Sequence, residues 1–240
     1  MHFISMKLTN FTVLLFIGLI SFCSILTSCN ELGIGKLSEG SIEYRIEYPE
    51  IPEDNYLLDL LPAEMVTIFK SDAHRSDITA GMGLFKTSII CNEENENVLH
   101  VLKVLNKKYY SELDEKSFFE INPSFKNIKF EETGNTKMIA GYNCKELLVK
   151  MNLERDHSFH WYYTDEIKMN HPKDYSPFGE IDGVLLEYEL INYDTYMRFI
   201  AESVYREEIE DSKFLIGEEY EKLSPSDLNQ EIESIFSKVK

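Results

Sequence analysis

The sequence predicts a mainly β protein with a few helices: an antiparallel sheet of about eleven strands and a C-terminal helix. Three observations support this prediction. From Gly40 onward the apolar residues recur mostly at every second position, which is the period of a strand. Short polar turns, of the kind that join antiparallel strands, separate these runs. A helical period is clear only near the C-terminus.

The strands are expected in the following order. In residues 41–49, Ile42, Tyr44, Ile46 and Tyr48 share one face and charged residues share the other, which predicts a half-buried strand. Two later segments alternate in the same way, with apolar faces formed by Phe159, Trp161 and Tyr163, and by Val184, Leu186, Tyr188 and Leu190. Eight further segments have β character: residues 65–70, 74–79, 85–91, 98–104, 108–112, 128–132, 145–151 and 196–206.

Helices are expected to be few. Short helical turns are predicted at residues 56–61 and around Phe118 and Phe119, and residues 165–178 form an irregular connection. The C-terminal helix is better marked, because Ser224 can cap it and Pro225 suits its first position. Its apolar side chains then recur at helical spacing: Leu228, Ile232, Ile235 and Val239.

The N-terminus has the order of a secretory signal. Residues 1–10 carry one charge, Lys7, and an uncharged apolar run follows over residues 11–26. The run is short for a membrane-spanning helix, although an uncleaved anchor helix is the alternative. Either Met1 or Met6 can serve as the start, since Lys7 precedes the apolar run in both cases.

The residues Leu26-Thr27-Ser28-Cys29 resemble the lipobox of bacterial lipoproteins. This resemblance implies cleavage before Cys29 and acylation of its thiol, and several acyl chains would anchor the chain stably to a membrane. The predicted organisation is therefore a signal peptide over residues 1–28, a lipidated N-terminus and tether over 29–39, and one domain over 40–240. By the sorting rule of some Gram-negative bacteria, Asn30 implies the outer membrane, with the domain facing the periplasm or the cell surface.

The charge of the chain restricts its partners. Lys and Arg number 24 against 42 Asp and Glu, for a net charge of -18. A surface this acidic repels nucleic acid and anionic headgroups, because both are recognised by clustered Lys and Arg. We therefore expect no nucleic-acid partner, and contact with the membrane through the lipid anchor.

Three segments carry a family resemblance: Lys137 to Lys145 (KMIAGYNCK), Trp161 to Ile167 (WYYTDEI) and Gly183 to Glu187 (GVLLE). In this order they resemble an uncharacterised bacterial lipoprotein family with a LolA-like fold. The resemblance implies an incomplete β-barrel, a half-barrel of about eleven strands, over a cavity that receives a lipid or a lipoprotein acyl chain. The apolar strand faces supply the candidate lining, for which ordinary core packing is the alternative: Tyr44, Ile46, Phe159, Trp161, Tyr163, Leu186 and Tyr188.

Other candidate sites are weaker. Cys91 and Cys144 can form a disulfide in an oxidising compartment, or they can be two buried thiols. His157 and His160 are three residues apart and so point to opposite faces of a strand, which argues against a metal site. Gly81 to Phe85 is expected to be a hairpin turn with Leu84 and Phe85 inward, the alternative being an apolar loop that dips into a membrane or partner.

No enzyme motif is present in the sequence, so we expect a protein that is not an enzyme and has no cofactor. The favoured function is non-enzymatic binding of a hydrophobic ligand by a lipid-anchored envelope protein. One alternative is a structural or assembly lipoprotein that docks other envelope proteins and whose half-barrel is filled by its own side chains. Another is a hydrolase whose site the sequence does not reveal.

Overall fold

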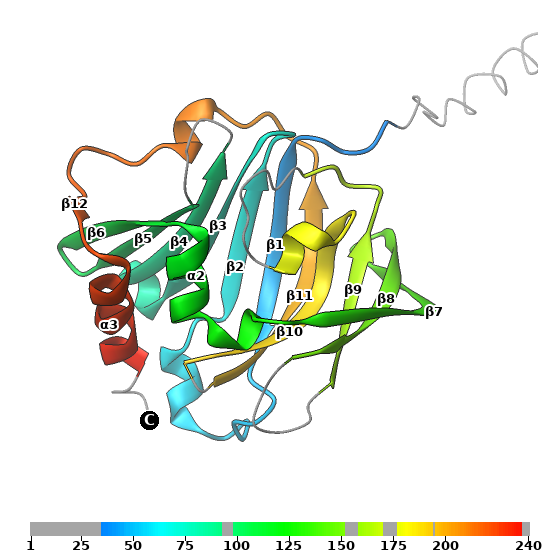
Figure 1. Cartoon of the computed structure of the whole chain (residues 1–240), viewed down its shortest axis with the longest axis horizontal. Helices are drawn as coiled ribbons and strands as arrows, with labels where there is room; N and C mark the ends of the chain where they lie inside the picture. The colour runs from blue at the N-terminus through cyan, green and yellow to red at the C-terminus, as the bar shows by residue number, and fades with distance from the viewer. Residues whose placement is uncertain (1–34, 93–97, 152–157, 170–176, 194, 237–240) are drawn as a thin grey trace, which may run out of the picture. The chain divides into compact units, whose positions relative to one another are not determined.

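A computed structural model describes residues 35–92, 98–151, 158–169, 177–193 and 195–236. It divides the chain into two compact units, Met1–Gly35 and Lys36–Lys240. The predicted signal peptide and Cys29 lie outside the described residues, so their assignments stay predictions. The second unit is built on one open sheet of twelve strands (Figure 1).

The sheet confirms the predicted fold class, which was mainly β, antiparallel and not closed. Its order is β12-β6-β5-β4-β3-β2-β1-β11-β10-β9-β8-β7, and every neighbouring pair is antiparallel except β12 with β6. Eleven strands overlap the predicted segments, and β12 is additional. Their bounds are β1 Gly40–Glu47, β2 Glu64–Phe69, β3 Ala73–Ala80, β4 Phe85–Asn92, β5 Val98–Val104, β6 Lys107–Leu113, β7 Lys129–Ile139, β8 Tyr142–Lys150, β9 Ser158–Thr164, β10 Val184–Asn192, β11 Thr195–Tyr205 and β12 Glu221–Lys222.

Two α-helices in the described residues lie in front of the sheet in Figure 1. In α2 (Glu115–Ile121) the side chain of the N-cap residue Asp114 accepts a hydrogen bond from the backbone N–H of Ser117. The predicted C-terminal helix is α3 (Pro225–Phe236), and the Ser224 hydroxyl accepts from the backbone N–H of Asp227 at 3.2 Å, as expected for a cap. Short 3-10 turns complete the fold: η1 Tyr56–Leu60, η2 Gly81–Gly83, η3 Pro123–Phe125, η4 Pro177–Glu180 and η5 Asp211–Phe214.

The sheet has an inner face, against which α2 and α3 pack, and an outer face on the opposite side. On the inner face α3 places Leu228 and Ile232 against Phe85 and Leu102. On the outer face of β3–β5, η5 and the chain before it cover an apolar cluster made of Ala73, Ile90, Leu99, Val101, Ile209 and Phe214. Both faces of this half of the sheet are therefore covered.

The first of the three segments that carry the family resemblance, Lys137 to Lys145, lies in the hairpin β7–β8. Ala140 and Gly141 sit at its tip with φ values of 47° and 88°. Positive φ at both central residues is the requirement of a type I′ turn, which explains a glycine at this position. The turn sets the pairing of Ile139 with Tyr142, and two residues later it places the Cys144 side chain in the core.

The folded part begins ahead of Gly40, where the sequence places the end of the tether. Leu37 forms an isolated parallel bridge with Ile167 and is 4% exposed. Its N–H donates to the carbonyl of Glu166 at 2.9 Å, and its own carbonyl accepts from Lys168 N–H at 2.7 Å. Leu37, which the sequence places in the tether, therefore packs in the core of the second unit.

The β3–β4 connection is a hairpin turn, but it differs from the prediction in one side chain. Phe85 is buried as expected, whereas Leu84 is 55% exposed and Met82 at the tip is fully exposed. Leu84 directly precedes Phe85, and neighbouring side chains at a strand end point to different sides, so burial of Phe85 leaves Leu84 facing solvent. Among the described residues, no helix has the length and apolar character needed to cross a membrane.

Candidate functional site

The inner face of the sheet holds a cavity of about 280 Å³. Its floor consists of side chains from β1–β5, β10 and β11, and α2, η3 and η4 cover it. The volume lies near the lower end of the range of small-molecule sites, roughly 300–1,000 Å³. The cavity therefore contradicts an inner face filled completely by its own side chains.

A series of aromatic rings follows one side of the cavity. Each ring contacts the next, with centroid distances of 6.1 Å for Phe118–Phe125, 6.0 Å for Phe125–Phe178, 5.5 Å for Phe178–Tyr188 and 4.8 Å for Tyr188–Phe199. The last pair is stacked with an interplanar angle of 6°. Such contacts fix the rings in place, so this side of the cavity is a preformed apolar surface.

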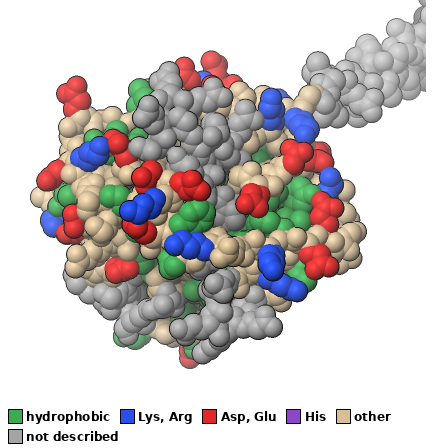
Figure 2. All heavy atoms as spheres, viewed as in Figure 1, with side chains coloured by type: hydrophobic (Ala, Val, Ile, Leu, Met, Phe, Trp, Pro, Cys, Tyr) green, Lys and Arg blue, Asp and Glu red, His purple; other side chains and the backbone are tan. Residues whose placement is uncertain are grey.

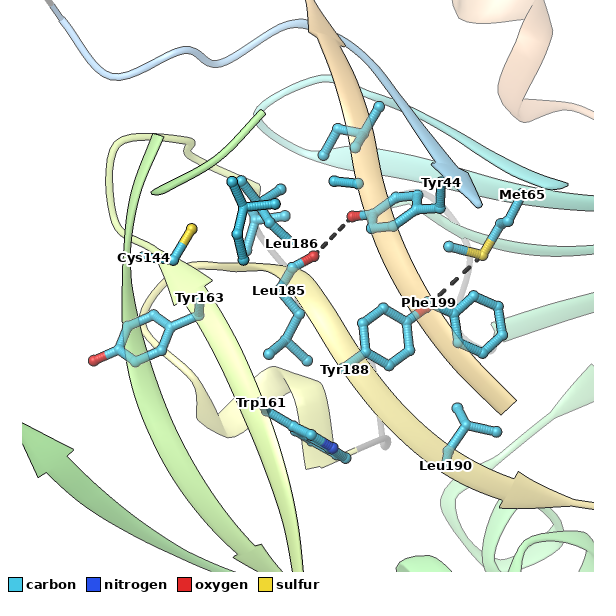
Figure 3. Packing of buried hydrophobic residues seen from close by; sticks show 14 of the residues in the cluster. Tyr44, Met65, Cys144, Trp161, Tyr163, Leu185, Leu186, Tyr188, Leu190 and Phe199 are labelled. Atoms are coloured by element: carbon cyan, nitrogen blue, oxygen red, sulfur yellow. Dashed lines mark hydrogen bonds between the residues drawn. The ribbon is translucent and has the colours of Figure 1, made fainter. Parts of the chain in front are cut away.

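Two tyrosines of the cavity lining, Tyr44 and Tyr188, use their hydroxyls within the protein. Tyr44 donates to the carbonyl of Leu185 at 2.8 Å, and the Tyr188 hydroxyl contacts Met65 Sδ at 3.8 Å (Figure 3). Burial raises the pKa of both phenols above the ordinary value, so both are neutral at physiological pH. They therefore present ring surface to the cavity and no charge.

The structure divides the seven predicted lining residues into two groups. Tyr44, Ile46 and Tyr188 line the cavity. The other four pack in the core beside it: Phe159, Trp161, Tyr163 and Leu186. Period-two alternation identifies a buried face and does not distinguish solid packing from the edge of a hollow. Binding of a ligand by any of the seven stays a prediction.

Trp161 lies directly behind the lining. Its ring is fully buried and contacts the lining residues Phe178 and Tyr188 at centroid distances of 5.4 and 6.2 Å. Its indole N–H donates to the carbonyl of Glu189 at 2.8 Å. Trp161 is also the single tryptophan of the chain, so its fluorescence reports on the cavity side of the core.

Leu185 lines the cavity although strict alternation assigns it to the opposite face from Tyr188. The register of β10 against β9 shifts between Leu185 and Glu187, which is a β-bulge or a similar irregularity. A bulge inserts one residue and re-aims the side chains beside it. Leu185 was not predicted from the sequence because no glycine or proline marks this shift within the strand.

A second side of the cavity is polar, and the sequence analysis missed it entirely. We call Thr67, Ser76, Thr87 and His100, on β2, β3, β4 and β5, the polar ridge. Thr67 Oγ1 and Ser76 Oγ are 2.8 Å apart, and Thr87 Oγ1 lies 3.0 Å from His100 Nε2. A signal was present: neutral Ser76 alternates with charged Arg75 and Asp77, so one face of β3 is polar but uncharged.

The lining carries no ionised carboxylate, ammonium or guanidinium group among the described residues. Burial lowers the pKa of His100 to about 4, so its imidazole is neutral at neutral pH. The exterior is different, because acidic and basic side chains are interspersed over the face shown in Figure 2. A chain with a net charge of -18 therefore encloses a site without Asp, Glu, Lys or Arg.

Charged residues are buried instead on the outer face of β7–β11. Glu187 is 2% exposed and forms ion pairs with Lys137 and Arg198. Burial alone would raise the pKa of Glu187, but hydrogen bonds from Lys137 and Arg198 outweigh burial and hold the pKa below its ordinary value. Glu187 is therefore ionised and compensated within the protein.

Glu146 forms a second polar centre on the same face. Its carboxylate accepts hydrogen bonds from Thr133, Asn135 and Tyr162 at 2.5–2.7 Å, and His160 Nδ1 lies at 3.0 Å. The bonds from Thr133, Tyr162 and Asn135 lower the pKa of Glu146 to about 2. Four partners occupy this carboxylate, so it stabilises the fold and is a poor general base. His157, the other imidazole considered in the sequence, lies outside the described residues.

The possible disulfide between Cys91 and Cys144 is contradicted. The two residues are not bonded to each other and both are buried. They lie on β4 and β8, which have six other strands between them in the sheet order, and they belong to different core clusters. Strands are about 4.8 Å apart, so the two Cα atoms are too distant for a disulfide. The alternative of two buried thiols describes the structure.

Comparison with known families and structures gives a fold and no established function. Residues 57–168 match the family described as "Domain of unknown function (DUF4412)". No curated protein matches the chain. The structure of PNGF-II is similar over 80% of this chain and 33% of that chain, with 18% identity and a TM-score of 0.50.

Two further structures are more distant. MucB is 9% identical over 78% of this chain and 60% of that chain, with a TM-score of 0.31. The MucA/MucB complex of Pseudomonas aeruginosa is 10% identical over 77% of this chain and 57% of that chain, with a TM-score of 0.30. The chain thus spans about a third of the length of PNGF-II and less than two thirds of that of MucB. The likeness to PNGF-II supports the large β-sheet fold alone.

Proposed function

We propose that this chain is a lipid-anchored cell-envelope protein that binds a hydrophobic ligand, a lipid or a lipoprotein acyl chain, in the inner-face cavity without catalysing a reaction. One observation carries the proposal: a preformed cavity of about 280 Å³ whose described lining lacks Asp, Glu, Lys and Arg, in a strongly acidic chain. Small-molecule sites are usually apolar hollows of this kind with a few placed polar groups.

The energetic basis of binding is burial of apolar surface. Each methylene moved from water to an apolar site contributes about 0.8 kcal/mol. The rings from Phe118 to Phe199 contact one another and are held in place, so little side-chain freedom is lost on binding. An acyl chain lying along these rings therefore gains affinity without an ionic contact.

The anchor and the location rest on the sequence. Leu26-Thr27-Ser28-Cys29 supports acylation of Cys29 and export of the remaining chain. Asn30 supports the outer membrane, with the domain facing the periplasm or the cell surface. The open sheet agrees with the half-barrel that the LolA-like resemblance implies, and an anchored protein would receive its ligand at the membrane surface.

Photocrosslinking in intact cells tests the proposal. Cells producing the full chain are fed a photoreactive fatty acid, irradiated, and the chain is purified under denaturing conditions for peptide mapping. We expect label on two separate peptides, one containing Cys29 through acylation and one containing cavity residues such as Phe118 or Tyr188. Label on the Cys29 peptide alone would contradict ligand binding and leave the anchor intact.

Matched variants locate the crosslink. Ser76→Phe places a ring in the cavity and so removes the space for the acyl chain. It should reduce the label on the cavity peptides at least about tenfold. Val66→Phe makes a similar change on the outer face of β2, where Val66 is 39% exposed, and should leave the label unchanged. Equal loss in both variants would show that the crosslink does not come from the cavity.

A further inference from the structure

We infer that the cavity selects an uncharged acyl ester or amide and discriminates against the free fatty acid, the acyl chain lying on the aromatic rings and the ester or amide group on the polar ridge. This inference rests on the proposed function and deepens it, because it names the chemistry of the ligand. It follows from the position, the hydrogen-bonding capacity and the neutrality of the ridge.

The ridge and the aromatic surface are adjacent in the sheet. Strands β2–β5 carry the ridge, and the next three strands in the sheet order, β1, β11 and β10, carry Tyr44, Phe199 and Tyr188. Three strand spacings place the ends of the ridge about 14 Å apart. One amphiphile can therefore contact both sides of the same cavity.

The ridge keeps hydrogen-bonding capacity beyond its internal contacts. Thr67 and Ser76 are opposite each other in the β2–β3 ladder and share one hydrogen bond, while Thr87 contacts His100 and the carbonyl of Val101. A hydroxyl has one donor and two acceptor positions, so a single shared bond does not saturate the Thr67–Ser76 pair. An ester or amide carbonyl can accept from such a hydroxyl, and an amide N–H can donate to it.

The same cavity is unfavourable for a carboxylate. An ionised group that leaves water needs an opposite charge or several hydrogen bonds in return. No Lys or Arg lines the described part of the cavity, and His100 is buried and neutral at physiological pH. An ester or amide has no charge to compensate, so it loses far less hydration energy on entering.

Quenching of the Trp161 fluorescence tests this selectivity. The full chain is kept soluble in an amphipathic polymer and titrated with dibromostearic acid, its glycerol monoester, its primary amide and a brominated alkane. Bromine quenches an indole only at short range, and Trp161 contacts the lining through Phe178 and Tyr188. At about pH 9, well above the pKa of a carboxylic acid, we expect the ester or the amide to bind at least about tenfold more tightly than the acid.

A paired variant assigns the selectivity to the ridge. Thr67→Val with Ser76→Ala removes both partners of one hydrogen bond, so neither is left unsatisfied and the fold is preserved. Binding of the ester and the amide should weaken about tenfold, while binding of the alkane should not change. The control, Thr136→Val with Ser158→Ala, makes the same substitutions at exposed positions of β7 and β9. It should change neither the binding of the ester and the amide nor that of the alkane.

The outcomes separate this inference from the proposed function. If the acid binds as tightly as the ester and the amide, or the paired variant leaves all affinities unchanged, the inference is wrong while hydrophobic binding stands. If none of the four probes quenches Trp161, both are wrong. The ester and amide titrations also distinguish a glycerolipid from the amide-linked chain of a lipoprotein as the source of the acyl group.

Discussion

The two halves of the sheet distribute their side chains in opposite ways. In β8 and β9 the inner face is solid and aromatic around Trp161, and the outer face of β8–β10 carries the ionised Glu146 and Glu187. In β2–β5 the inner face carries the polar ridge and the cavity, and the outer face carries the apolar cluster of Ile90, Leu99 and Val101 under η5. A continuous sheet can thus be solidly packed in one part and hollow in another.

Removing the buried charge behind the solid half should have the largest effect. Glu187→Ala leaves Lys137 and Arg198 without their shared partner, and we expect a loss of about 3–5 kcal/mol in the free energy of unfolding. Urea denaturation followed by circular dichroism measures it. The control is Glu202→Ala on the outer face, whose side chain is 57% exposed and whose loss should cost no more than about 1 kcal/mol. Similar losses in the two variants would show that burial of Glu187 has no energetic consequence.

A pair of phenylalanines compares solid packing with the cavity. Phe159→Ala removes a fully buried ring from the solid half, and we expect a loss of about 3–5 kcal/mol because a new void forms. Phe125→Ala removes a partly buried ring that already borders the cavity, for which we expect about 1–2 kcal/mol. The same urea titrations give both values. If Phe125→Ala is as costly as Phe159→Ala, the covering side of the cavity is as tightly packed as the core.

The smallest expected effect is a dependence on pH. The pKa of Glu146 is lowered from 4.5 to about 2, so its contribution to stability is present above pH 4.5 and is lost as the pH falls toward 2. Glu146→Gln should be less stable than the parent chain at neutral pH, and the difference should shrink over this interval. Urea midpoints measured from pH 7 to about pH 2 test it, and a constant difference would exclude Glu146 as the titrating group.

The sequence predicted strands such as β1, β2 and β9 well because each has one buried face, and a buried face produces period-two alternation whatever covers it. It also predicted α3, since Ser224 and Pro225 mark its start locally. It did not predict β12, two residues whose pairing with β6 depends on the path of the chain after η5. Leu37 was missed for the same reason, because its partner Ile167 is far away in the sequence.

The candidate site was predictable only in part. Tyr44, Ile46 and Tyr188 follow from alternation, whereas Leu185 depends on a register shift and the polar ridge is marked only by neutral Ser76 between two charged residues. Whether an apolar side chain borders a hollow depends on how closely α2, η3 and η4 approach the sheet, which is a property of the assembled fold. Hydrophobic pattern therefore locates the core and leaves the hollow to be found in the structure.

The open sheet also has a consequence for self-association. A sheet that does not close leaves two edge strands, and an unprotected edge strand is a template for fibril growth. Here β12 is only two residues long, and β7 breaks register between Glu132 and Thr136 and carries charge at Lys129, Glu131 and Lys137. Both edge strands are poor templates, so the sheet can remain open without the protein polymerising through strand pairing.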